Sequence, residues 1–127
     1  MQACGDAHLS NFGGYVSPER HLVFDLNDFD ETLPAPWKWD LKRLVASIVV
    51  AERSNGYHAA DCAEHVHTAV RAYWERMAQF AEMTNLAVWY THISATDIIA
   101  GLTGAIKKEF ERGVERAFHR DHLQVLA

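Results

Sequence analysis

Residues 5–14 read GDAHLSNFGG, a decapeptide with an aspartate, a histidine, a serine, an asparagine and three glycines. Because Gly, Asp, Ser and Asn are all turn residues, such a stretch is either a plain turn or a loop whose side chains carry chemistry. A second polar segment, NDFDE at residues 27–31, follows two short apolar runs. Whether these two segments meet in space decides the fold and the function that the sequence predicts.

The two apolar runs predict a short β-hairpin. Residues 12–16 and 21–26 are rich in β-branched, aromatic and aliphatic side chains, and the turn-forming SPER separates them. A hairpin brings its two ends together, so Asp6 and Asn11 are expected to converge with the polar residues after the second run: Asp25, Asn27, Asp28, Asp30 and Glu31. Since converging carboxylates repel, we expect a hard divalent cation such as Mg²⁺ among them.

The middle of the chain predicts two helices. Apolar residues from Leu41 to Val49 recur at three- and four-residue spacing, which is typical of a buried helix over about residues 38–54, closed by Asn55 and Gly56. A second helix is expected over about residues 60–84, with Asp61 and Glu64 as a capping box. Its predicted core stripe consists of Val66, Val70, Tyr73, Trp74, Met77, Phe80 and Ala81.

The last third of the chain is expected to be helical as well. The run NLAVWYTHI suits either a helix or a strand. Ser94 is placed to cap a short helix that contains Asp97 and ends at Gly101. An amphipathic helix over about residues 104–122 follows, with one apolar face made of Ile106, Phe110, Val114 and Phe118.

Composition limits the class of protein. The 127 residues are enough for one domain, and the 49% hydrophobic and 23% charged fractions are those of a soluble globular chain. The net charge of −5 argues against nucleic acid as a partner. No apolar run is long enough to cross a bilayer, no signal peptide is visible, and Cys4 and Cys62 form no CxxC pair, so a reduced cytoplasmic setting without a membrane is predicted.

The order and spacing of the polar residues match a known active-site pattern. In protein kinases a catalytic-loop Asp precedes a metal-binding Asn with four residues between, and a second Asp binds Mg²⁺ after a short hairpin. Asp6 and Asn11, then Asp28 beside Phe29, have this arrangement. The GDxHxxN loop and the twelve-residue step from Asp28 to Asp40 resemble the aminoglycoside and choline phosphotransferase branch of the kinase-like fold.

A bacterial family is more similar still. GDAHLSNFGGY and FDLNDFDETLPAPWKWDLKRL resemble the family called domain of unknown function 2252 over about the first 60 residues, and the helical remainder is loosely similar. The resemblance implies an α+β, mostly α fold like the C-terminal lobe of a kinase. It implies one partial domain, with catalytic and metal-binding loops and the hairpin in residues 1–40 and a helical subdomain in residues 41–127.

The resemblance also implies roles for single residues. Asp6 orients or deprotonates the acceptor hydroxyl, and His8 supports the loop or the phosphates. Asn11 binds one metal ion, and Asp28 holds the metal that bridges the nucleotide phosphates, a role for which Asp25 competes. Asp40 is expected to brace the loop through backbone contacts at the N-terminus of its helix.

Two parts of a kinase-like enzyme have no counterpart in this sequence. No glycine-rich loop and no strand lysine are found, and Cys4 stands where the related loops have His. Because the polar loop begins almost at residue 1, the chain is expected to be a fragment or a truncated form whose nucleotide-gripping N-terminal lobe is absent and is itself a possible partner.

Three functions follow from these observations. The favoured one is a phosphotransferase lobe that uses Mg²⁺ or Mn²⁺ and ATP on an unknown small-molecule or protein hydroxyl. The second is a non-catalytic helical domain for binding or regulation, and the third is a metal-dependent hydrolase. A structural or solvent-facing role is expected for the set Cys62, His65 and His67. The tryptophans are expected to be core or loop-anchoring aromatics: Trp37, Trp39, Trp74 and Trp89.

Overall fold

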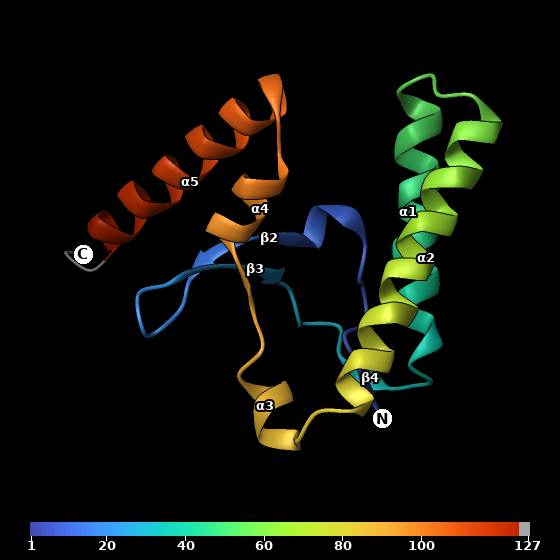
Figure 1. The fold of residues 1–127 in the computed structure, drawn as a ribbon, viewed down its shortest axis with the longest axis horizontal. Helices are drawn as coiled ribbons and strands as arrows, with labels where there is room; N and C mark the ends of the chain where they lie inside the picture. Colours follow the sequence, from blue (N-terminus) through green and yellow to red (C-terminus); the bar gives the residue numbers. More distant parts are fainter. Residues whose placement is uncertain (125–127) are drawn as a thin grey trace. The chain divides into compact units, whose positions relative to one another are not determined.

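A computed structural model describes residues 1–124 of the chain, with side chains described as far as residue 115. The described part is mostly helical with small sheets, which confirms the α+β class (Figure 1). Its strands are β1 (Gln2–Ala3), β2 (Phe12–Val16), β3 (Leu22–Leu26), β4 (Leu33–Pro34) and β5 (Ile93–Ser94). Its helices are α1 (Lys38–Ser54), α2 (Ala59–Ala81), α3 (Asn85–Trp89), α4 (Ala95–Gly101) and α5 (Gly104–Gln124), with a 3₁₀ turn η1 (Leu9–Asn11).

The chain forms two compact units that are interleaved in the sequence. The first unit consists of Met1–Phe12 and Asp28–Thr91, and the second of Gly13–Asn27 and the residues from His92 onward. Residues 5–12 of the first polar segment and 28–31 of the second therefore belong to the first unit together with α1 and α2, whereas Gly13, Gly14 and Asn27 belong to the second. Each unit is described separately below.

A two-stranded sheet at the start of the first unit fixes the polar loop. β1 pairs with β4 in antiparallel fashion, with Gln2 opposite Pro34 and Ala3 opposite Leu33. The Ala35 amide extends the pairing by donating to the Met1 carbonyl at 3.0 Å. The sequence contains no signal for this strand, because two residues are too few to leave a period-2 pattern.

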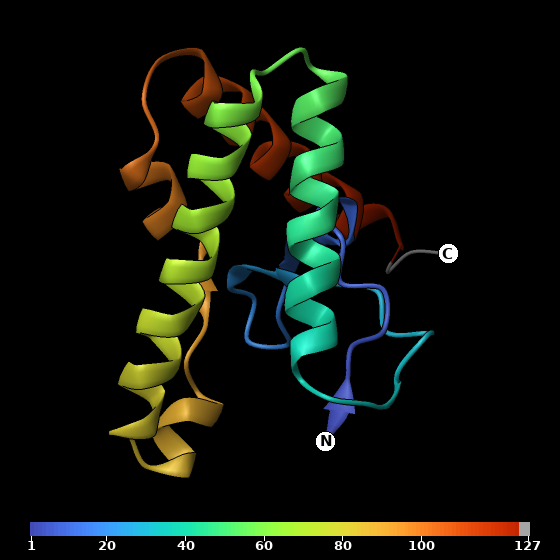
Figure 2. The ribbon, with the colours of Figure 1, turned by 90° about the vertical axis from the view of Figure 1, so that its right-hand side faces the viewer.

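Helices α1 and α2 lie side by side and are joined by a tight turn (Figures 1 and 2). The predicted bounds of α1 are confirmed, and Gly56 ends it with a φ of +80°. The predicted capping box at the start of α2 is wrong. His58 is the N-cap residue, and Asp61 lies inside the first turn, where its charge favours the positive end of the helix dipole.

The buried character predicted for α1 and for the tryptophans is also wrong. No residue of α1 is buried, and the side chains of Trp74 and Trp89 are 69% and 83% exposed. Trp37 is 51% exposed although its ring stacks on Tyr73 with 5.9 Å between centroids. Apolar spacing shows which face of a helix is hydrophobic, but it does not show how much protein covers that face.

The contact between α1 and α2 contains a small polar cluster. Glu52 of α1 pairs with the imidazole of His65 on α2, and the edge of the Tyr57 ring faces the same imidazole. Cys62, one turn before His65, is only 4% exposed, and burial raises the pKa of its thiol. Neither Cys62 nor Cys4 forms a disulfide within the described part of the chain.

The second unit contains the predicted hairpin, which is confirmed. β2 and β3 are neighbours in a sheet of order β2-β3-β5, and Arg20 takes a φ of +64° in the turn between them. β5 runs antiparallel to β3, with Val23 opposite Ser94. The predicted cap on α4 is also confirmed, because the Ser94 hydroxyl accepts a hydrogen bond from the Asp97 amide at 3.1 Å.

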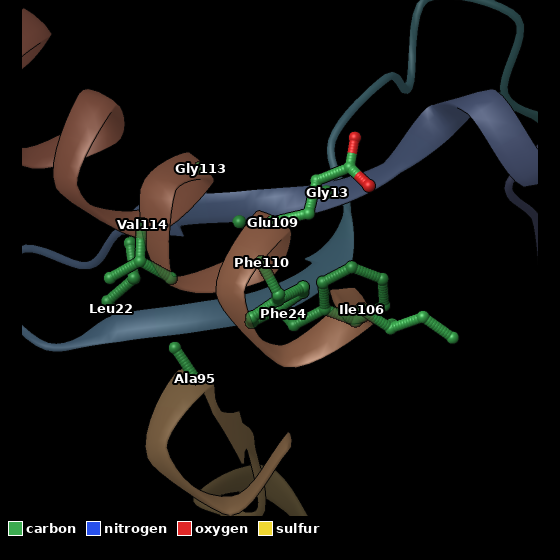
Figure 3. Close-up of a pocket in the computed structure, with 10 residues that line it drawn as sticks. Gly13, Leu22, Phe24, Ala95, Ile106, Glu109, Phe110, Gly113 and Val114 are labelled. Carbon is green, nitrogen blue, oxygen red and sulfur yellow. The ribbon is translucent and has the colours of Figure 1, made fainter. Parts of the chain in front are cut away.

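Helix α5 covers an apolar cavity of about 460 Å³ in the second unit (Figure 3). Three of the residues predicted for its apolar face, Ile106, Phe110 and Val114, line this cavity, and Phe110 packs against Phe24 at 6.4 Å between centroids. The side chain of Phe118, the fourth residue of that face, lies outside the described side chains. No helix in the described part of the chain is long and apolar enough to cross a membrane.

Candidate functional site

Helix α1 holds the first polar loop through one of its faces. Asp40, Arg43 and Ser47 are spaced by three and four residues, so they lie on the same side of the helix. The carboxylate of Asp40 accepts the backbone amides of Cys4 at 2.9 Å and Gly5 at 3.3 Å. The predicted bracing of the loop by Asp40 is therefore confirmed.

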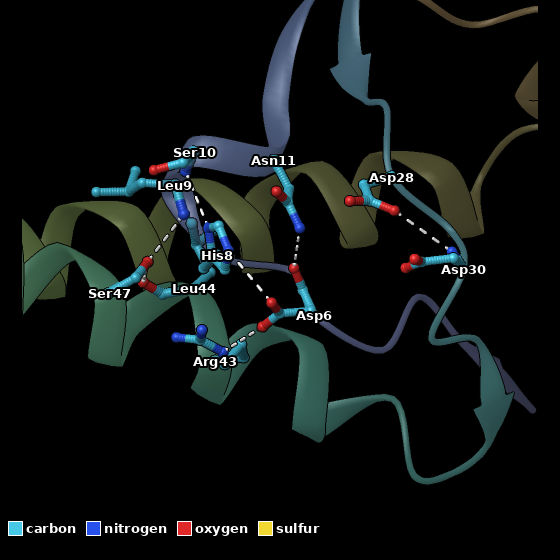
Figure 4. A network of polar contacts seen from close by, with 10 residues as sticks. All are labelled: Asp6, His8, Leu9, Ser10, Asn11, Asp28, Asp30, Arg43, Leu44 and Ser47. Carbon is cyan, nitrogen blue, oxygen red and sulfur yellow. Dashed lines mark hydrogen bonds and ion pairs between the residues drawn. The ribbon is translucent and has the colours of Figure 1, made fainter.

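Ser47 holds the far end of the same loop. Its Oγ accepts the amide of Leu9 at 3.0 Å and donates to the carbonyl of Leu44 at 2.7 Å (Figure 4). The 3₁₀ turn η1 is thus tied to α1, while Asp40 ties down the start of the loop. The segment between these two attachments carries Asp6 and His8.

Asp6 receives two side-chain contacts through its carboxylate. Arg43 donates from Nε to Oδ1 at 2.6 Å, and His8 Nε2 lies 3.2 Å from Oδ2. Since His8 Nδ1 accepts the amide of Ser10 at 3.1 Å, a neutral imidazole carries its proton on Nε2, facing Asp6. Both contacts fix the direction of the Asp6 carboxylate, and His8 supports the loop itself.

Arg43 and Ser47 were not among the candidates drawn from the sequence. Both lie in WDLKRLVAS, which resembles a family motif through its Asp and Leu but gives no sign of what each later residue touches. Their spacing from Asp40 is the signal that could have identified them. A helix that braces a loop with one side chain presents the residues three and seven positions later to the same loop.

The second polar segment approaches the first at Gly5. This glycine has a φ of +97°, and a Cβ on it would lie 2.2 Å from the carbonyl oxygen of Glu31. The close approach follows from the pairing of β1 with β4, because Gly5 lies just after one strand and Glu31 just before the other. The loop of Asp6 and the loop of Asp28 are therefore packed against each other, backbone to backbone.

Figure 4 shows Asn11 on the first loop and Asp28 on the second, each with a hydrogen bond within its own loop. The Nδ2 of Asn11 donates to the backbone carbonyl of Asp6 at 2.9 Å, which leaves its Oδ1 as the acceptor. The Oδ1 of Asp28 accepts the amide of Asp30 at 3.4 Å, and Asp28 itself is exposed. Oxygen atoms of an amide and a carboxylate are ligands that Mg²⁺ prefers.

The charges of this region repel one another. A hydrogen bond to Asp28, and next the negative charge of Asp28, raise the pKa of Asp30, and the charge of Asp6 adds to the effect. Asp28 and Asp6 thus both disfavour the charged form of the Asp30 carboxyl. A divalent ion is the group that would relieve this repulsion, so the donor set fits Mg²⁺ or Mn²⁺.

The protein offers few side-chain ligands for such a metal ion. Among the side chains of residues 1–115 no set of three or more His, Cys, Asp or Glu is arranged to hold a metal. Asn11 and Asp28 alone would leave most of the octahedron of Mg²⁺ to water and to ligand oxygens. That is the usual situation for Mg²⁺ bound together with a phosphate compound.

Comparison with protein families identifies the chain over its whole length. The family model described as an uncharacterized protein conserved in bacteria, DUF2252, matches residues 1–127. The chain belongs to the DUF2252 family. Comparison with curated proteins and with solved structures gives no match.

The match to the DUF2252 model covers more of the chain than the motifs that indicated the family. The motif resemblance covered about the first 60 residues, whereas the family match includes α2 to α5 as well. In this DUF2252 chain one of the candidate metal ligands belongs to a different unit from Asn11 and Asp28. Asp25 belongs to the second unit, where its Oδ1 accepts the amide of Leu26 at 2.7 Å.

The repulsion in the DUF2252 loops gives a first prediction. Replacing Asp28 with alanine should lower the pKa of Asp30 toward its ordinary value, because both the hydrogen bond and the charge that raise it are removed. The pKa is measured from the carboxyl carbon shift of Asp30 during a pH titration. Asp61→Ala, in the first turn of α2, is the control and should leave it unchanged. An unaltered pKa of Asp30 in Asp28→Ala would contradict the assigned cause.

Proposed function

We propose that the chain is a kinase-like phosphotransferase lobe that transfers a phosphoryl group from ATP to a hydroxyl acceptor with the help of Mg²⁺ or Mn²⁺. The observation that supports this most strongly is the packing of the Asp6 loop against the Asp28 loop. This packing joins the loop of the oriented Asp6 carboxylate to a loop whose carboxylate oxygens are of the type that Mg²⁺ prefers. Positioning and charge stabilisation are what phosphoryl transfer requires of a protein.

Asp6 is the catalytic residue of the proposal. Its carboxylate, oriented by Arg43 and His8, takes the proton of the acceptor hydroxyl. The acceptor oxygen forms a bond to the γ-phosphorus while the bond from that phosphorus to the β,γ-bridging oxygen breaks, and ADP leaves with the electron pair. His8 and Arg43 are positioning residues in this step.

The cation would be held by Asn11 and Asp28, and Asp25 is the alternative carboxylate that the sequence offers. When bound, the ion neutralises negative charge on the nucleotide phosphates. The protein's own contribution is to present these oxygens on a loop whose backbone is fixed by Asp40 and by the contact of Gly5 with Glu31.

The lobe is incomplete as an enzyme in this proposal. The sequence contains no glycine-rich phosphate loop and no strand lysine, so a nucleotide bound here makes contacts with the metal and the loops alone. An N-terminal lobe that supplies these elements is the proposed partner. Nucleotide affinity of the chain by itself is expected to be weak and to depend on the metal.

Calorimetric titration of the chain tests the function. Mn²⁺ alone, ATP alone and Mn²⁺ with ATP are added in turn, and inorganic triphosphate replaces ATP in a further run. Binding of Mn²⁺ only when ATP or triphosphate is present supports the proposal. Binding of Mn²⁺ without phosphate, together with phosphate release from a phosphomonoester, would instead indicate the metal-dependent hydrolase.

A non-catalytic binding domain is the second candidate, and a specific observation favours it. Large apolar side chains of the first unit are exposed, among them Trp74 at 69%, Leu86 at 67% and Trp89 at 83%. Exposed apolar surface of this kind is typical of contacts with other proteins. Absence of any metal or nucleotide uptake in the titration would favour this candidate over phosphoryl transfer.

A further inference from the structure

We infer that the groove beside Asp6 binds a hydroxyl compound with an anionic group, a carboxylate or a phosphate, that is held by Arg43. The inference rests on the proposed function, since it names the class of acceptor for the same site. It is carried by the shape and the charge of a cavity that the cation-ligating side chains do not line.

The groove lies between the catalytic loop and α1. Its volume is about 460 Å³, and the loop contributes His8, Leu9 and Ser10 to its wall. The helix contributes Arg43 and Val50, with Ala and Ser residues along the rest of its lining. Because these helix side chains are small, an extended molecule of a few carbon atoms can lie along α1 with its apolar part against Leu9 and Val50.

Arg43 is the permanently charged residue in the described lining of the groove, and its pairing with Asp6 occupies the Nε side of the guanidinium. None of its described lining residues is a carboxylic acid, whereas Arg43 is permanently charged. Arg43 gives only its Nε to Asp6, and in the described part of the chain its two terminal amino groups have no hydrogen-bond partner. A guanidinium edge with free parallel N–H groups matches the two oxygens of a carboxylate or phosphate.

The position of the groove suits an acceptor. In the view of Figure 4, Arg43, Ser47 and Leu9 lie to the left of the Asp6 carboxylate, Asn11 lies above it, and Asp28 lies to the right. A hydroxyl that reaches Asp6 from the groove would therefore meet a phosphate donor held on the opposite side. In this arrangement the terminal amino groups of Arg43 would hold the acceptor, and the oxygens of Asn11 and Asp28 would hold the metal and nucleotide.

Binding of simple probes tests the inference without nucleotide. The ¹⁵N-labelled chain is titrated with glycerol 3-phosphate, with glycerate and with glycerol, and amide shifts are followed. We expect saturable shifts at Leu9, Ser10 and Val50 with one or both anions, and at least tenfold weaker binding of glycerol. Preference for the phosphate or for the carboxylate identifies which anionic group the groove takes.

Variants separate the groove from general effects of charge. Arg43→Gln should weaken binding of the preferred anion about tenfold to hundredfold, as expected for loss of a charged hydrogen-bond pair. Arg53→Gln removes the same charge from the same helix outside the groove and should bind as the parent does. Val50→Trp, at a position that is 68% exposed, should fill the groove and weaken binding while leaving the pair of Arg43 and Asp6 intact.

The outcomes distinguish this inference from the proposed function. Equal binding of glycerol and the anions, unaltered binding by Arg43→Gln, or no shift with any probe would overturn the acceptor class. These measurements contain no ATP and no metal. Suppose that the groove binds anions but the chain takes up no nucleotide with metal. The phosphotransferase proposal would then be contradicted, and the groove would be an anion-binding site of another function.

Discussion

Replacing Asp28 with alanine is expected to abolish metal-dependent nucleotide binding by the chain. Asp28 is an exposed carboxylate of the second loop (Figure 4). Without it, Asn11 remains as a single neutral ligand, and Mg²⁺ needs at least one or two carboxylates besides phosphate oxygens. Affinity for Mn²⁺ with ATP is measured by calorimetry. It should fall by roughly a hundredfold or more, the order of magnitude expected when an interaction with a charged group is lost.

The same variant should keep or increase its stability without metal. Asp28 and Asp30 repel each other in the folded chain, and removal of one charge relieves this repulsion. The melting temperature in the presence of a chelator is therefore expected to stay level or to rise. Asp25→Ala is the matched comparison for the metal. If Asp28→Ala binds Mn²⁺ with ATP like the parent and Asp25→Ala does not, Asp25 is the main ligand.

Replacing Gly5 with alanine is expected to cause the largest loss of stability of any single small change in the loop. The φ of +97° is strained for a residue with a side chain, at a cost of about 1–2 kcal/mol. The new Cβ would also lie 2.2 Å from the Glu31 carbonyl oxygen, so one backbone segment must move. We expect the free energy of unfolding to fall by at least about 3 kcal/mol, a large part of the usual stability of a domain.

Gly56→Ala is the matched control for this prediction. Gly56 has a similar φ of +80°, but nothing lies within 4 Å of the position of an added Cβ. Only the strain remains there, so a loss of about 1–2 kcal/mol is expected. Urea unfolding of both variants measures the difference. Equal losses for the two variants would show that the contact between Gly5 and Glu31 does not hold the two loops together.

Several elements could be predicted from the sequence because local signals agreed. Helix α1 has both a periodic apolar pattern and the stop signal of Asn55 and Gly56, and its bounds are those predicted. The hairpin combines two strand-like runs with a turn sequence, and α4 begins with a capping serine. The role of Asp40 could be anticipated because a family motif and a helix start coincide at that residue.

Other features depend on contacts that no local pattern encodes. β1 exists because β4, about thirty residues later, offers it a partner. The predicted capping box failed because α2 starts two residues before Asp61, where no side chain caps it. Arg43 could not be assigned from its type, since a helical arginine is usually a solvated surface residue. Its role follows only from the position of Asp6, which the brace from Asp40 places above the same helix face.

Paramagnetic broadening by Mn²⁺ tests the central claim most directly. A substoichiometric amount of Mn²⁺ is added to the ¹⁵N-labelled chain with ATP present, and the loss of each amide signal is recorded. A cation site between the Asp6 loop and the Asp28 loop predicts that the amide signals of Asn11, Asp28 and Asp30 disappear first. In the Asp28→Ala variant the signals of Asn11 and Asp30 should persist. Broadening that begins at other acidic residues, or that spares both loops, would contradict a cation site between the Asp6 loop and the Asp28 loop.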